Sequence, residues 1–111
     1  MRRTAVAAPA PDDDGWDSAR VRLARRLAAN PDDVEAAHSI ALIIGFEGDM
    51  EASIQALADL VQRHPEDVAI RYDLAMAQMM SGDTDSACRH LQRILQLDPS
   101  HEKARQQSAY C

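Results

Sequence analysis

Aromatic side chains are scarce in this sequence, since only 4% of its 111 residues are Phe, Trp or Tyr while 46% are hydrophobic. A core with so few rings must be built from alanine and aliphatic side chains, which suit closely packed helices better than a sandwich or barrel. The length allows one domain and excludes a multidomain enzyme. The composition therefore predicts a small, all-α protein.

Basic charge is also in short supply. The chain has 12 Lys and Arg residues against 18 Asp and Glu residues, which gives a formal net charge of −6. Because sequence-independent binding to nucleic acids and anionic membranes depends on a basic surface, we expect neither as a partner.

Long apolar runs are missing as well, and the opening segment from Met1 to Pro11 contains no apolar block of the kind found in signal peptides. The two cysteines, Cys88 and Cys111, have no metal-binding or redox spacing, and Cys111 falls at a terminus that is expected to fray. We therefore expect reduced thiols, with no disulfide framework, and a cytoplasmic location.

What the sequence does contain is a repeat with a period of 34 residues. It shows in three prolines and two Gly-Asp pairs: Pro31, Pro65, Pro99, Gly48-Asp49 and Gly82-Asp83. Apolar positions such as Leu57 and Leu91 follow the same shift. A fixed period of this length indicates stacked supersecondary units.

Each period is interpreted as two helices joined by a tight turn. The glycines allow a helix to end and the following aspartates can cap the next helix, while each proline separates one helix pair from the next. Asp32 and Glu35 have the spacing of a capping box. The expected helices cover roughly residues 17–29, 33–46, 50–63, 67–80, 84–97 and 101–110.

These positions resemble the tetratricopeptide repeat family, whose 34-residue unit places small and large apolar residues in fixed slots. The matching residues are Ala19, Leu23, Leu27, Pro31, Ile40, Ala41, Gly48, Leu57, Leu60, Pro65, Leu74, Ala75, Gly82, Ala87, Leu91, Ile94 and Pro99. Four positions depart from the family pattern, namely Ala37, Ser53, Arg71 and Gln78. The resemblance implies a short right-handed superhelical stack of antiparallel helix pairs.

The resemblance also implies a domain organisation. The expected segments are a disordered N-terminal arm at 1–15 and a tetratricopeptide-like domain at 16–111, composed of a half repeat at 16–33, full repeats at 34–67 and 68–101, and a capping helix at 102–111. The arm is assigned on its Ala- and Pro-rich composition, which lacks a burial pattern.

In this family the first helices of successive units line a concave groove. The groove slots fall on Glu35, His38, Leu42, Phe46, Tyr72, Asp73, Met76, Met79, Met80, Lys103 and Gln107, with Gly45 in a further slot. Independently of the resemblance, Met76 and Met80 are an i, i+4 pair, as are Leu42 and Phe46. Methionine adapts to irregular apolar surfaces, so we hypothesise a groove for an apolar or helical protein segment.

Two alternatives to this groove stay open. The methionines could only fill gaps against neighbouring helices, or the N-terminal arm could occupy the groove. Some family members clasp a peptide's terminal carboxylate with basic and amide side chains. Here only Lys103 could serve in that way, and Asp73 would repel a carboxylate, so such a ligand is not expected.

Catalytic and metal sites are not indicated. No nucleophile, base and orienting group form a motif, and the four glycines are isolated, so we expect neither an enzyme nor a cofactor. Cys88 and His90 at i, i+2 point to different sides of a helix, which disfavours metal binding and leaves Cys88 as a packing residue. Arg22 and Arg26 are expected to form a solvated face, as are Arg89 and Arg93.

The sequence thus predicts a non-enzymatic scaffold for protein–protein interaction. The alternative is an assembly subunit that self-associates, for example as a homodimer, or docks into a larger complex through the ends of its stack.

Overall fold

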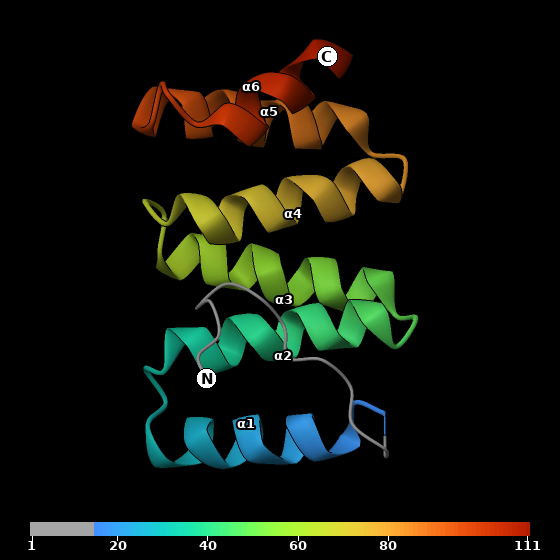
Figure 1. Cartoon of the computed structure of the whole chain (residues 1–111), viewed down its shortest axis with the longest axis vertical. Coiled ribbons are helices and arrows are strands. Elements are labelled where there is room, and N and C mark those ends of the chain that lie inside the picture. Colours follow the sequence, from blue (N-terminus) through green and yellow to red (C-terminus); the bar gives the residue numbers. More distant parts are fainter. Residues whose placement is uncertain (1–14) are drawn as a thin grey trace. The chain divides into compact units, whose positions relative to one another are not determined.

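The computed structural model describes residues 15–111, which form six α-helices and a short 3-10 helix (Figure 1). The elements are α1 (Asp17–Ala29), α2 (Val34–Phe46), α3 (Met50–Arg63), α4 (Val68–Met80), α5 (Thr84–Leu97), α6 (Glu102–Gln107) and η1 (Ser108–Tyr110). The all-α prediction is confirmed, and each helix begins within one residue of its predicted start. The predicted arm lies outside the described residues, apart from Gly15.

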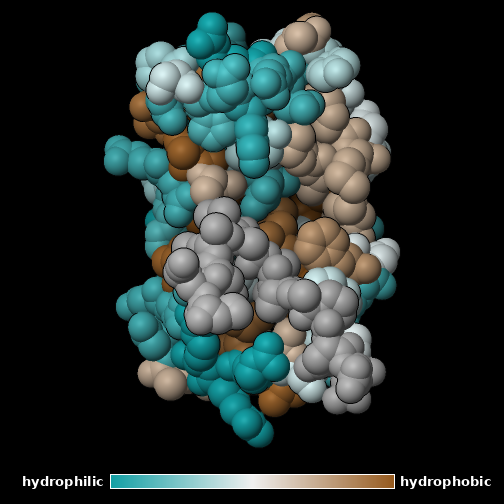
Figure 2. Space-filling view, in the orientation of Figure 1, coloured by the Kyte–Doolittle hydropathy of each residue, from teal (hydrophilic) through white to brown (hydrophobic). Residues whose placement is uncertain are grey.

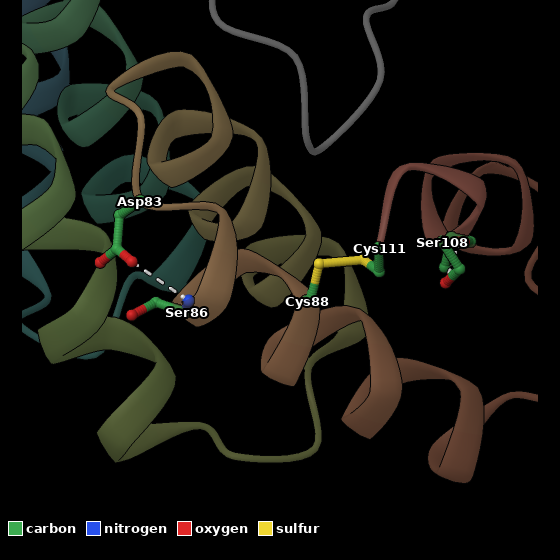
Figure 3. The surroundings of a disulfide bond; sticks show 6 residues. Asp83, Ser86, Cys88, Ser108 and Cys111 are labelled. Atoms are coloured by element: carbon green, nitrogen blue, oxygen red, sulfur yellow. Dashed lines mark hydrogen bonds between the residues drawn. A yellow bond between two sulfur atoms is a disulfide. The ribbon is translucent and has the colours of Figure 1, made fainter.

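The two Gly-Asp pairs end one helix and begin the next, as predicted. Gly48 and Gly82 have φ values of +107° and +94°, a region in which a side chain would be strained. Asp49 Oδ1 then accepts a hydrogen bond from the backbone N–H of Ala52 at 3.0 Å. Asp83 Oδ1 accepts one from the backbone N–H of Ser86 at 3.2 Å (Figure 3). Each aspartate thus satisfies a donor that the first helical turn leaves unpaired.

The predicted cap at Asp32 is wrong by one residue. The backbone N–H of Asp32 instead donates to the side chain of Asn30, in the turn that follows α1. Asp33 therefore becomes the N-cap of α2, and its carboxylate accepts from the backbone N–H of Ala36 at 3.0 Å. The same shift occurs one repeat later, where Asp67 caps α4.

Arg26, expected on a solvated face, has a side chain that is 40% exposed but is also paired with acidic residues. Its guanidinium donates to both carboxylate oxygens of Asp33, at 3.0 and 3.1 Å, and to Glu35 at 3.0 Å. The backbone hydrogen bond from Ala36 and the contact with Arg26 both lower the pKa of Asp33. Arg26 therefore ties the last turn of α1 to the first turn of α2.

The chain divides into two compact units, the first reaching to Ala56 and the second beginning at Leu57. In the first unit α1 and α2 pack through a small cluster, composed of Ala19, Leu23, Ala36 and Ile43. Trp16, Leu27 and Ile40 pack around this cluster.

A close contact between α2 and α3 completes the first unit. Ser53 Oγ donates to the backbone carbonyl of Ala41 at 2.7 Å, so the family departure at Ser53 is a satisfied buried hydroxyl. A Cβ atom at Gly45 would lie 3.0 Å from this Oγ and 3.2 Å from Ser53 Cβ. Gly45 therefore faces α3 and permits the close approach, rather than lining a groove.

In the second unit α4, α5 and α6 share one core. Its fully buried members are Ala75 in α4, Ala87, Leu91 and Ile94 in α5, and Ala104 in α6. Figure 1 shows α4 and α5 as antiparallel neighbours, with α6 against α5. The small and large apolar slots of the repeat thus supply this core, as the resemblance implies.

The expectation of free thiols is wrong, because Cys88 and Cys111 form a disulfide (Figure 3). Ala104 is fully buried against α5, and η1 then returns the chain to α5, so Cys111 lies beside Cys88. Cys88 is therefore a cross-link rather than a packing residue. The bond also removes reduced thiols as a ground for a cytoplasmic location, since disulfides persist mainly in oxidising compartments.

Candidate functional site

Four apolar residues of the predicted groove lie on α4, in the second unit. Tyr72, Met76 and Met79 are half-buried and pack against the core of that unit. Met80, in contrast, is 75% exposed at the end of the helix. The α4 face, defined as these four residues, therefore packs against the core at three of its members and is open to solvent at Met80.

The buried end of the α4 face is fixed by an aromatic contact. The rings of Tyr72 and His101 have centroids 5.5 Å apart and are tilted by 30°. His101 is itself held, because its Nδ1 accepts a hydrogen bond from the backbone N–H of Ala104 at 3.1 Å. Burial and the nearby charge of Asp73 raise the pKa of Tyr72, so its phenol stays protonated and can donate a hydrogen bond.

Polar members of the predicted set lie on α4 and α6, in the same unit. Asp73 is half-buried on α4, Lys103 is exposed on α6, and Gln107 is half-buried one turn later. Lys103 and Gln107 are separated by four residues and so share one side of α6.

The first unit holds the rest of the predicted set on α2. Glu35 accepts the hydrogen bond from Arg26 described above. His38 is only 3% exposed and so offers almost no surface to a partner. Leu42 is half-buried, and Phe46 is 62% exposed.

Trp16 was not among the predicted residues, although it supports Phe46. Their ring centroids lie 5.5 Å apart with an interplanar angle of 26°, a stacked arrangement. Beside the rings, Arg20 donates to Glu47 at 2.6 Å. Antiparallel pairing of two consecutive helices brings the start of the first to the end of the second, so the predicted helix pair contained the signal for this contact.

Large apolar side chains therefore reach the surface in both units. Figure 2 shows such side chains, drawn in brown, among hydrophilic ones on the face in view. Within residues 15–111, the exposed large hydrophobic residues are Val21, Phe46, Met80 and Tyr110. Single exposed hydrophobic residues are common in proteins, so it is the adjoining half-buried methionines that distinguish the α4 face.

A hollow beside the disulfide was also not predicted. It has a volume of about 340 Å³ and is lined by Cys88, Arg89, Gln92, Leu95, Ser108 and Cys111. Figure 3 shows the disulfide linking α5 to the segment after Ser108, which forms one wall of the hollow. The sequence contained no signal for it, because it exists only where η1 returns to α5.

Neither a metal site nor a membrane span is found in the described part of the chain. Among residues 15–111, no group of three or more His, Cys, Asp or Glu side chains could hold a metal ion. No helix in the same range has the length and apolar character needed to cross a membrane.

Comparison with known proteins gives one family match. The family model described as "Tetratricopeptide repeat" matches residues 47–110, which is more than half of the chain and extends from the end of α2 through η1. No curated protein matches the sequence.

Proposed function

The chain belongs to the tetratricopeptide repeat family, whose members generally mediate protein–protein interaction, and from this premise we propose that it is a non-enzymatic scaffold. In this proposal an apolar or helical segment of a partner protein binds to the α4 face. Lys103 and Gln107 on α6, in the same unit, are assigned a supporting role.

The observation that carries this proposal is the exposure of Met80 next to two half-buried methionines. Met76, Met79 and Met80 have i, i+3, i+4 spacing, the pattern with which helical surfaces meet apolar anchors. Covering a fully exposed methionine contributes about 1.5–3 kcal/mol. Because the Met80 side chain is still mostly exposed, a partner that covers it would gain a large part of this burial free energy.

The character of the α4 face also specifies the partner segment. Flexible thioether side chains accept apolar anchors of several shapes, which favours a leucine-, isoleucine- or phenylalanine-bearing segment over one particular side chain. A basic residue of the partner is expected near the acidic side chain of Asp73, which lies on the same helix.

Affinity capture from the native cell tests the proposal. Met80→Glu adds one negative charge at the exposed end of the α4 face, and Gln62→Glu adds the same charge at an exposed position of α3. Met80→Glu should reduce the recovery of specific partners about tenfold or more, while Gln62→Glu retains them. Equal melting curves of the two variants control for folding. Undiminished capture by Met80→Glu would reject the α4 face as the binding surface.

A second candidate function is supported by exposed residues in the first and last segments of the described chain. Val21 on α1 and Tyr110 on η1 each expose a large apolar side chain. These residues favour an assembly subunit that self-associates or docks into a complex through them. Sedimentation equilibrium distinguishes the two candidates. A concentration-dependent dimer that is lost in Tyr110→Ser would support the assembly subunit, whereas a monomer at all concentrations would oppose self-association.

A further inference from the structure

A cluster of basic side chains lies in the second unit, between α4 and α5. Arg71 Nη1 is 3.1 Å from His90 Nδ1, and its Nη2 donates to the carbonyl oxygen of Pro65 at 2.8 Å. A guanidinium can only donate, so His90 Nδ1 accepts and the imidazole proton is on Nε2. Arg93 is three residues after His90 and therefore shares its side of α5.

Neither Arg71 nor Arg93 has a carboxylate partner among residues 15–111, whereas the charge of Arg89 acts on Asp83 and helps to lower its pKa. Arg71 contacts an imidazole and a carbonyl group, Arg89 donates to Ser86 Oγ, and Arg93 donates to Gln96 Oε1. Elsewhere in the described chain, Arg20, Arg26 and Arg63 each pair with an acidic side chain. The basic cluster, defined as Arg71, Arg89, His90 and Arg93, thus retains positive charge on Arg71 and Arg93 that no carboxylate of the described residues offsets, in a chain with an excess of acidic residues.

Within the cluster Arg71 and His90 are partly buried, whereas Arg89 and Arg93 are exposed. Arg71 Nε is buried and has no hydrogen-bond partner. Burial and the charge of Arg93 lower the pKa of Arg71, while burial and the charges of Arg71 and Arg89 lower the pKa of His90. A half-buried charge beside like charges destabilises a fold unless an opposite charge offsets it.

We propose that the basic cluster binds an acidic segment of a protein partner, with an Asp or Glu carboxylate of that segment held between the guanidinium groups of Arg71 and Arg93. Arg71 still has one N–H on each of Nη1 and Nη2, and Arg93 uses only Nη1 in its hydrogen bond with Gln96. Planar guanidinium groups match the two oxygens of a carboxylate.

A short acidic segment fits this cluster better than a polyanion such as a nucleic acid. The net charge of −6 repels an extended polyanion at long range, whereas one or two carboxylates can still be held by local contacts. Arg71 and Met80 are nine residues apart on α4, which is two and a half turns of an α-helix. Arg71 and the exposed end of the α4 face therefore lie on opposite sides of α4. The proposal for the basic cluster can thus be rejected without affecting the proposal for the α4 face, and the reverse also holds.

A nuclear magnetic resonance titration of the full chain tests this proposal. The probe is a capped peptide with three consecutive glutamates, compared with its glutamine counterpart, and the readout is the His90 ring together with the Arg71 Nε–H signal. The glutamate peptide should shift both signals and raise the pKa of His90, because a carboxylate offsets the arginine charges. The glutamine peptide should leave them unchanged.

Matched variants make the test specific to this site. Arg93→Gln should weaken binding of the glutamate peptide about tenfold, the loss expected for one charge-assisted contact. Arg63→Gln removes the same charge from an exposed pair with Asp59 and should leave binding unchanged. Equal weakening by both variants would overturn the proposal, as would an absence of shifts at millimolar peptide. Inorganic phosphate that binds as tightly as the peptide would reject the protein segment in favour of a small anion.

Discussion

Reduction of the disulfide between Cys88 and Cys111 should lower the free energy of unfolding by about 3 kcal/mol. The bond links residues with a sequence separation of 23, and closing a loop of this length in the unfolded chain corresponds to about 3.4 kcal/mol at 25 °C in the chain-entropy description. The structure of the folded state should change little on reduction, because the buried Ala104 and the contact between Tyr72 and His101 still hold α6 in place. Since small domains have a total stability of about 5–15 kcal/mol, the loss would be large.

Urea denaturation followed by circular dichroism measures this difference. The oxidised protein, the reduced protein and Cys88→Ser with Cys111→Ser are compared at the same pH, and a thiol titration verifies the redox state of each sample. The reduced protein and the double variant should share a midpoint well below that of the oxidised protein. An unchanged midpoint, after the thiol titration has shown complete reduction, would refute the reasoning that the bond acts by restricting the unfolded chain.

Three further predictions concern the cores and the basic cluster. Burial and neighbouring arginines lower the pKa of His90 below its ordinary 6.5. The stability associated with the neutral imidazole should therefore be complete above pH 6.5 and be lost as the pH falls through the folded-state pKa. Thermal melting of Arg71→Met should show a weaker dependence on pH, because one of the neighbouring positive charges is removed. Leu91→Ala removes a fully buried side chain and should cost about 2–5 kcal/mol in urea denaturation, and a cost below 1 kcal/mol would contradict its place in the core. Gly45→Leu should cost about 1–3 kcal/mol because its side chain meets Ser53, and an unchanged melting temperature would show that α2 and α3 can separate freely.

The helices could be predicted closely because their boundaries depend on local chemistry. Gly48 and Gly82 adopt backbone angles that favour glycine, and the aspartate after each one caps the next helix within three residues. Such signals act over one helical turn and are complete in the sequence. The cap at Asp33 was misplaced only because two aspartates are adjacent and the turn that selects between them involves Asn30.

Contacts between helices were harder to predict. The disulfide joins residues 23 positions apart and depends on the path of η1, which no local pattern determines. Ser53, Arg71 and Gln78 stood out as departures from the family pattern, yet their partners depend on the neighbouring helices. Ser53 is satisfied by a backbone carbonyl, whereas Arg71 Nε and Gln78 Oε1 are buried without a hydrogen bond.

In the candidate site, too, the position of a side chain along its helix could be predicted, but its burial could not. The family resemblance placed Tyr72, and spacing alone placed Met76 and Met80, along one side of α4, but neither could tell how deeply each side chain would be covered. The core of the second unit half-buries the first two and leaves Met80 in water. His38, which has equivalent spacing on α2, is almost completely buried. That these faces together form a partner-binding groove stays a prediction.

Photo-crosslinking from the end of the α4 face is the most direct test of protein binding there. A photoreactive amino acid replaces Met80 in one sample and Gln62 in the other, and both proteins are irradiated in the native cell. We predict discrete crosslinked partner proteins from position 80 and none from position 62. Identical products from both positions, or none from position 80, would contradict the account.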